Sequence, residues 1–348
     1  MPRDVKTLCS RYGLTYVETA DLRLRRRRCG RGFGYIDGEG RTVRDKSLKA
    51  RIRQLAIPPA WTEVCIAEDD RAHIQAVGRD VEGRLQYRYH AEWENARAET
   101  KLHRLRRLGS ALPRLRDTVR KALSTPELTR NNVIAAVVRL IDRALLRPGH
   151  DEYAQATGSR GASTLLKSDV AVTGDKVVVE FKGKAGKPVR REVRDRLLAR
   201  VTRRLLAGKG RRLFSAVDDN GRLRPVTARE VNAFLAEASG TDVTAKDFRT
   251  FRASAEALAF LTEHNGHETA RLKKQTIVQA ADRASEMLVN TRSVARSSYI
   301  HPVVIKAYES GKLGASLFRG RVRAGLNRME SALMRFLETS ANFRNDRK

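Results

Sequence analysis

The chain has 348 residues, which is long for one compact domain, so two domains are expected. It carries 70 Lys and Arg residues against 40 Asp and Glu residues, a formal charge of +30. Such a surplus attracts polyanions, of which nucleic acid is the commonest, but a purely structural nucleic-acid binder would share it. The charge therefore indicates the class of partner and leaves the activity open.

The sequence shows no feature of secretion, membrane insertion or zinc binding. Its three cysteines, Cys9, Cys29 and Cys65, lie far apart, without CxxC or Cys–His spacing. A sparse, odd set of cysteines is typical of a reducing cytoplasm. The N-terminus lacks the apolar segment of a secretory signal, and no run of 18 apolar residues occurs. We expect a cytoplasmic, nucleoid-associated protein with no membrane contact and no metal site.

Residues 1–91 are expected to form a small N-terminal domain rich in β-structure. Short strand-like runs alternate with glycine turns, and the basic stretch Ser47–Leu55 predicts a single helix. Residues 78–89 predict a strand, a turn and a second strand. The polar stretch 92–100 then opens a helical region, which places the domain boundary between residues 91 and 92.

Residues 92–348 are expected to form a larger, mainly helical domain with a minor sheet and a C-terminal tail. The spacing of apolar residues predicts a helix over Asn132–Leu146, stopped by Pro148-Gly149. Three β-branched runs separated by glycine turns, within residues 170–189, then predict an antiparallel three-stranded meander. The fold class is therefore α+β.

Four further helices are predicted in this region. One spans Val193–Leu206, and a second begins at Thr227, where Thr227 and Glu230 form a capping-box pattern. A third begins at Thr244. In the last, Leu326–Leu337, four apolar residues are expected to share one stripe that packs on the rest of this domain: Leu326, Met329, Leu333 and Leu337.

Four polar residues occur where packing does not require them: Arg147 at a helix end, Lys184 on a strand turn, Arg249 in an apolar helix, and Tyr299 after a polar segment. Each has an ordinary structural explanation. An arginine at a helix end often caps carbonyls, a lysine in a turn is usually solvated, and a lone tyrosine is usually packing. A functional interpretation of these residues therefore depends on their order along the chain and on the residues around them.

The stretches around these residues resemble type IB DNA topoisomerases, most closely the small bacterial and poxvirus-like branch. The matching blocks are LLRPGHDEY at 145–153, VVEFKGK at 178–184, TAKDFRTFRAS at 244–254 and NTRSVARSSYIHP at 290–302. The N-terminal region matches through IPPAW at 57–61 and through residues 78–89. The resemblance covers roughly residues 22–315. The blocks together are specific for this family because they occur in the family's order, whereas any one block alone would be weak.

The resemblance implies relaxation of positively and negatively supercoiled duplex DNA. Tyr299 would attack a backbone phosphorus, leaving a 3′-phosphotyrosyl bond and a free 5′-hydroxyl. Arg147 and Arg249 would hold the non-bridging oxygens, and Lys184 would protonate the departing 5′-oxygen. Asn290, nine residues before the tyrosine where many members carry histidine, would donate a hydrogen bond. The covalent intermediate conserves the energy of the broken bond, so no ATP, metal or other cofactor is expected.

Further residues are implied to contact duplex DNA. Lys246, the first residue of Lys-x-x-Arg, would contact the phosphate or a neighbouring base edge. Tyr87 and Tyr89 alternate on a predicted strand, so both rings point to one face, where they either cover the sheet or contact DNA. The resemblance implies DNA contact, together with Arg79, Arg84 and Gln86. The two domains are then expected to clamp double-stranded DNA, in a protein that acts as a monomer and needs no protein partner. Whether the arginine-rich stretch Leu22–Arg31 contacts DNA is left open.

Two other functions remain alternatives at this point. A tyrosine recombinase shares the catalytic set but usually carries His-x-x-Arg, whereas this chain has Lys246-Asp-Phe-Arg249. A non-catalytic nucleic-acid scaffold would bind in a salt-sensitive way and form no covalent adduct. The pair His264 and His267 suggests a metal site, but the Asn-Gly turn between them favours a loop.

Overall fold

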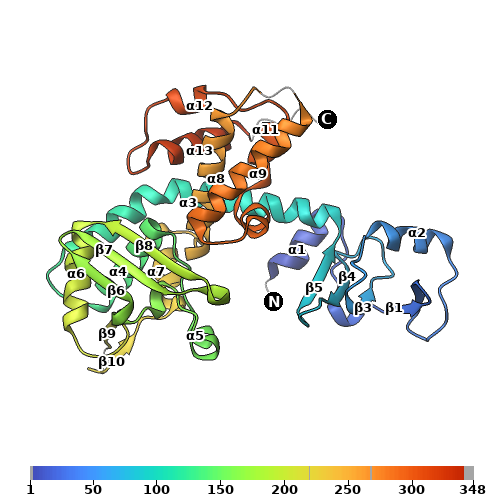
Figure 1. Cartoon of the computed structure of the whole chain (residues 1–348), viewed down its shortest axis with the longest axis horizontal. Coiled ribbons are helices and arrows are strands. Elements are labelled where there is room, and N and C mark those ends of the chain that lie inside the picture. Colours follow the sequence, from blue (N-terminus) through green and yellow to red (C-terminus); the bar gives the residue numbers. More distant parts are fainter. Residues whose placement is uncertain (1–2, 219, 267–268, 341–348) are drawn as a thin grey trace. The chain divides into compact units, whose positions relative to one another are not determined.

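The computed structural model describes residues 3–218, 220–266 and 269–340 and forms two compact units, Met1–Thr100 and Lys101–Lys348 (Figure 1). The division falls inside one continuous helix, α3 (Ala91–Ser124), and so lies later than the predicted position at residue 91. The polar stretch 92–100 is the first part of this helix. None of the helices in the described ranges is both long enough and apolar enough to cross a membrane.

The first unit is built on a five-stranded antiparallel sheet with the order β2-β1-β3-β4-β5. The strands are β1 (Leu24–Cys29), β2 (Gly32–Ile36), β3 (Thr62–Ile66), β4 (Ile74–Arg79) and β5 (Leu85–Tyr89). Helix α2 (Lys46–Gln54) packs Ile52 against Leu24 and Ile66 of the sheet. The predicted helix and the strand pair at 78–89 are confirmed. The prediction of a single helix is wrong, because residues Arg3–Arg11 form a second, α1.

The second unit combines helices with the predicted three-stranded antiparallel sheet, of order β6-β7-β8. Its strands are β6 (Val170–Thr173), β7 (Lys176–Lys182) and β8 (Pro188–Arg194), and a two-stranded ribbon adds β9 (Ser215–Val217) and β10 (Leu223–Pro225). The α-helices after α3 are α4 (Arg130–Ala144), α5 (Asp151–Thr157), α6 (Arg196–Ala207), α7 (Ala228–Ser239), α8 (Ala245–Glu263), α9 (Ala270–Leu288), α10 (Arg292–Val294), α11 (Pro302–Glu309), α12 (Ser316–Arg319) and α13 (Arg328–Thr339).

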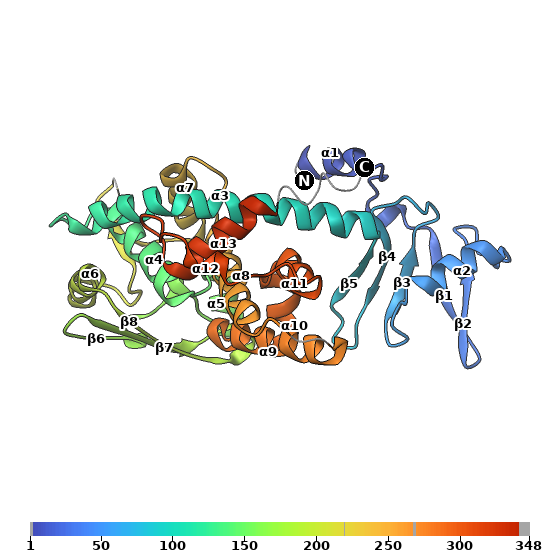
Figure 2. The same ribbon diagram turned by 90° about the horizontal axis from the view of Figure 1, so that it is seen from above.

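Two buried helices organise this unit. Helix α4 contacts α6, α7 and β8, and most of its residues are buried. Helix α8 contacts α9 on one side and α13 on the other (Figure 2). The capping box at Thr227 is confirmed, because the Glu230 carboxylate accepts from the Thr227 backbone N–H at 2.9 Å. The last helix packs on α8, as expected.

Three predicted helix ends are wrong. Helix α4 ends at Ala144, before the proline, because Leu145 takes the left-handed conformation with φ +54°. Helix α6 begins only after Asp195, whose side chain caps it, so residues 193–194 belong to β8. Helix α13 begins after Asn327, which caps it, and leaves Met329 on the exposed side.

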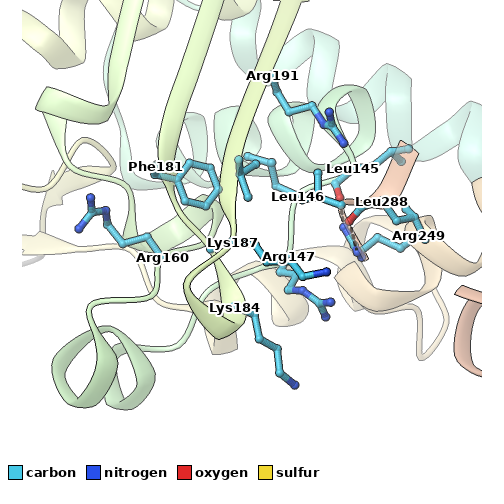
Figure 3. A pocket seen from close by; sticks show the side chains of 13 residues that line it. Leu145, Leu146, Arg147, Arg160, Phe181, Lys184, Lys187, Arg191, Arg249 and Leu288 are labelled. Carbon is cyan, nitrogen blue, oxygen red and sulfur yellow. Dashed lines mark hydrogen bonds between the residues drawn. The ribbon is translucent and has the colours of Figure 1, made fainter. Parts of the chain in front are cut away.

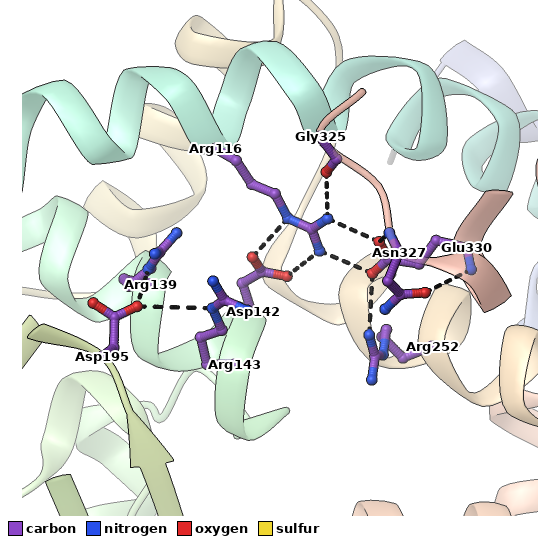
Figure 4. A network of polar contacts seen from close by, with 9 residues as sticks. All are labelled: Arg116, Arg139, Asp142, Arg143, Asp195, Arg252, Gly325, Asn327 and Glu330. Atoms are coloured by element: carbon purple, nitrogen blue, oxygen red, sulfur yellow. Dashed lines mark hydrogen bonds and ion pairs between the residues drawn. The ribbon is translucent and has the colours of Figure 1, made fainter. Parts of the chain in front are cut away.

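A buried ion network joins α3, α4, α8 and α13 (Figure 4). The Arg116 guanidinium donates to both oxygens of Asp142, at 2.8 and 2.9 Å, and to both oxygens of Glu330, at 2.8 and 2.9 Å. Arg252 adds a contact to Glu330 at 3.1 Å. Burial alone would raise the pKa of Glu330, but its bonds to Arg116 outweigh burial and lower the pKa to about 2.

Replacement of Glu330 by glutamine is expected to lower the free energy of unfolding by about 3 kcal/mol, because it removes the fully buried carboxylate that Arg116 and Arg252 share. The folded pKa is depressed, so this stabilisation is present above about 4.5 and is lost as the pH falls from there towards 2. Chemical denaturation at pH 7 and pH 3 measures both effects. The control is Glu338→Gln, whose exposed pair with Arg323 should contribute under about 1 kcal/mol. Equal effects of the two substitutions would contradict this account.

Candidate active site

Arg147 follows the end of α4 in a loop of fixed conformation. Its carbonyl oxygen accepts from the Ala162 N–H at 2.8 Å, and the next carbonyl accepts from Ser163 at 2.7 Å. Gly149 has φ +87°, and a Cβ there would lie 3.0 Å from the Gly161 backbone. The loop therefore requires glycine at this position, and it presents Arg147 just beyond the buried helix.

Tyr299 ends a π-helical turn, residues Ala295–Tyr299, that follows α10. The buried hydroxyl of Ser254, on α8, donates to the Tyr299 carbonyl at 3.2 Å and accepts from the His301 N–H at 3.0 Å. The chain on the C-terminal side of Tyr299 is thus bonded to the helix that carries Arg249. The Tyr299 side chain is only 4% exposed.

The structure brings four of the predicted residues into direct contact around the Tyr299 hydroxyl. Arg147 Nη1 donates to Tyr299 Oη at 2.9 Å, and Arg147 Nη2 donates to Asn290 Oδ1 at 2.6 Å. The Arg249 guanidinium lies 4.9 Å from the centre of the Tyr299 ring. Two guanidiniums from separate segments of the chain therefore flank one phenol, and one of them also bonds the Asn290 amide.

The charges around Tyr299 change its acidity. Burial raises the pKa of the Tyr299 hydroxyl, but Arg249 and Arg147 outweigh burial, and the pKa falls below its usual value of 10. Lys246, exposed on the first turn of α8, adds a smaller effect in the same direction. Removing the phenol proton is easier here than in water.

Two buried donors of this cluster have no hydrogen-bond acceptor in the part of the chain that the structure describes. They are Asn290 Nδ2 and Arg249 Nε. The other donors of Arg249 bond the carbonyls at the ends of two helices, Leu145 O and Leu288 O, the latter at 2.9 Å. A buried donor without a partner is costly unless something else satisfies it. The oxygens of an anion would do so.

Lys184 begins the tight turn between β7 and β8, in which Ala185 and Gly186 have φ of +58° and +73°. Figure 3 shows that this turn edges a pocket that Arg147 and Arg249 also line. Three further cations line it, Arg160, Lys187 and Arg191, which sequence reasoning missed. Lys187 belongs to the same glycine-rich turn as Lys184, and that proximity was a usable signal. The sequence around Arg191 gave no such signal, because Arg191 is placed by its contact with the end of α9.

The predicted DNA-contact residues of the first unit do not all share one face. The rings of Tyr87 and Tyr89 stack at 5.7 Å, which confirms that they point to the same side of β5. Gln86, which directly precedes Tyr87, points to the other side and bonds Asp80 at 2.8 Å. Arg84 pairs with Asp80 at 2.8 Å, and Arg79 pairs with Glu63 at 2.9 Å.

Comparison with known proteins decides the family. The family model of the eukaryotic DNA topoisomerase I catalytic core matches residues 90–315, and that of the bacterial DNA topoisomerase IB N-terminal domain matches residues 32–80. The chain belongs to the type IB DNA topoisomerases. The DNA topoisomerase 1B of Acanthamoeba polyphaga mimivirus is 30% identical over 267 residues, covering 75% of this chain and 80% of that protein.

Membership in this family makes the chain a DNA-relaxing enzyme with a DNA substrate, and it favours the topoisomerase over the recombinase alternative. Within the residues that the structure describes, no cluster of three or more His, Cys, Asp or Glu side chains could hold a metal ion. His267, one of the two histidines considered for such a site, lies outside the described residues. The cluster around Tyr299 is the candidate active site of this topoisomerase.

Proposed function

We propose that the chain relaxes positively and negatively supercoiled duplex DNA by cutting one strand with Tyr299, letting the free end rotate, and resealing the strand. The observation that carries this proposal is the hydrogen bond from Arg147 to the Tyr299 hydroxyl, with Arg249 beside the same ring. When a phosphodiester lies against this phenol, both guanidiniums are close enough to bind its non-bridging oxygens.

In the proposed cleavage step, Tyr299 Oη gives its proton to solvent water and bonds the phosphorus, while the bond from phosphorus to the 5′-oxygen breaks. Lys184 gives a proton to that oxygen, which a guanidinium with its far higher pKa is poorly suited to do. Arg147 and Arg249 hold the non-bridging oxygens as charge builds in the transition state, and Asn290 Nδ2 donates to one of them. Resealing reverses each step.

The proposed reaction needs no added energy source. The 3′-phosphotyrosyl ester conserves the free energy of the broken phosphodiester, so ATP is not consumed. The positive charge that stabilises the transition state comes from side chains, so we expect relaxation without a metal ion.

We propose that both units contact the duplex. Lys246 is exposed next to the site and suits a phosphate or a base edge. In the first unit, the Tyr87 and Tyr89 pair offers a flat aromatic surface on the last strand of the sheet, and Arg79, Arg84 and Gln86 offer donors once they leave their acidic partners.

Relaxation of plasmid DNA in EDTA and without ATP tests the proposal. Positively and negatively supercoiled plasmids should both be relaxed, because strand rotation about an uncut strand follows the torque in either direction. A requirement for Mg²⁺ or ATP, or relaxation of one sign alone, would refute the proposed mechanism. The matched control adds Mg²⁺ to the same reaction, and we expect the same products.

A further inference from the structure

Three arginines of different elements donate hydrogen bonds to the end of α9 and to Asn290 just beyond it. Arg191, on β8, donates to the carbonyls of Glu286 at 3.3 Å and Met287 at 2.7 Å. Arg249 donates to the next carbonyl, that of Leu288, at 2.9 Å. Val289 then turns the chain with φ +50°, which brings Asn290 to Arg147 at 2.6 Å.

The geometry points to Arg191 as the residue that positions Lys184 for proton transfer. Arg191 lies on the strand that leaves the Lys184 turn, opposite Val179 of β7 in the register of the hairpin. Its guanidinium therefore joins the hairpin to the segment that leads into Asn290 and Tyr299. This inference rests on the proposed function, in which Lys184 is the acid.

Arg191 bonds carbonyls, and no carboxylate pairs with it among the residues that the structure describes. Carbonyls at a helix C-terminus are the acceptors that helical bonding leaves free, and they carry partial negative charge. Partial burial lowers the pKa of Arg191. Its neighbour Arg190 differs, because it lies on the exposed side and pairs with Glu180.

The β7–β8 hairpin needs a contact like that of Arg191, because Lys184 lies on an exposed turn whose residues Ala185 and Gly186 have positive φ. Proton transfer requires the acid to lie within hydrogen-bond reach of the leaving oxygen. A displacement of about 1 Å can cost on the order of 100-fold in rate. Figure 3 shows Arg191 on the other side of the pocket from the Lys184 turn, near Leu145 and Arg249.

A DNA substrate with sulfur in place of the 5′-bridging oxygen separates positioning of the acid from other roles. In cleavage the Tyr299 Oη–P bond forms and the P–S bond breaks, and the thiolate leaves as a stable anion without needing a proton. Loss of the acid should therefore slow cleavage of the oxygen substrate only. Loss of a contact to the non-bridging oxygens should slow cleavage of both.

We would measure single-turnover cleavage of both substrates by wild type, Arg191→Ala, Arg191→Lys and Lys184→Ala. Arg191→Ala should slow cleavage of the oxygen substrate by about 10- to 100-fold and leave the sulfur substrate near the wild-type rate, as Lys184→Ala should. Arg191→Lys, which keeps a donor for one carbonyl, should be intermediate. Arg190→Ala is the matched control on the same strand, and its rates should be unchanged.

The sulfur substrate also reports folding, because an unfolded variant would cleave neither substrate. If Arg191→Ala is slow on both while Lys184→Ala is rescued, then Arg191 contacts the phosphate or only stabilises the fold, and the inference is overturned. Wild-type rates of Arg191→Ala on both substrates would also overturn it. If sulfur fails to rescue Lys184→Ala, then Lys184 is not the acid, and the proposed role of Lys184 falls together with the inference.

Discussion

Replacement of Tyr299 by phenylalanine is expected to abolish both DNA relaxation and the covalent protein–DNA adduct. The substitution removes one oxygen and keeps a ring that is 4% exposed and packed beside the Arg249 guanidinium, so the fold should be retained. Without a hydroxyl no bond to phosphorus can form. Relaxation is measured on supercoiled plasmid, and the adduct after quenching with SDS.

Tyr308→Phe is the matched control for this substitution. Tyr308 is also buried in the second unit, and its hydroxyl donates to the His264 carbonyl at 3.3 Å, away from the arginine cluster. Its loss should cost about 1 kcal/mol of stability and leave the adduct intact. DNA binding by Tyr299→Phe should match wild type. Relaxation by Tyr299→Phe at a rate near that of wild type would show that another group is the nucleophile.

Arg249→Ala should give the second largest loss, a fall in cleavage rate of about 100- to 1,000-fold. Arg249 is 3% exposed, lies beside the Tyr299 ring, and has a buried Nε without an acceptor in the described chain. A guanidinium held there strengthens its contact as charge develops on the phosphate oxygens. Arg249→Lys should recover only part of the rate, because an ammonium lacks the bidentate geometry. Single-turnover cleavage measures both variants.

Arg249 also stabilises the fold, so a structural control is needed. Arg252 lies one turn later on α8 and pairs with the buried Glu330 at 3.1 Å, away from Tyr299. Arg252→Ala should lower the unfolding temperature while keeping a cleavage rate within a few-fold of wild type. If Arg252→Ala slows cleavage as much as Arg249→Ala does, then loss of stability explains both results and the transition-state role of Arg249 is wrong.

Local patterns in the sequence predicted the elements that carry the site. Alternating β-branched residues and glycines identified the β6–β8 meander and put Lys184 on its turn. Apolar spacing identified α4 and α8, and with them Arg147 and Arg249. These features depend on neighbouring residues, so the chain shows them without knowledge of its packing. The order of the matched blocks then gave the family.

Contacts between distant segments could not be predicted in the same way. Helix α4 ends early because Leu145 takes the left-handed conformation, and the Leu145 carbonyl accepts from Arg249. The residues next to Leu145 in the sequence do not predict that conformation. The contact of Arg191 with Met287 joins a strand to the end of a helix far along the chain. Helix α1 was missed although its apolar residues Val5, Leu8 and Cys9 have helical spacing and join one apolar cluster, because the segment is short and mostly polar.

The central claim is that Tyr299 becomes bonded to the 3′ end of the cut strand. The most direct test uses one duplex labelled at either the 5′ or the 3′ end of the cleaved strand, incubated with the protein and quenched with SDS. We predict that the 5′-labelled strand migrates as a protein adduct and that the 3′-labelled fragment is released with a free 5′-hydroxyl. An adduct that carries the 3′ label, or no adduct with either label, would contradict the account.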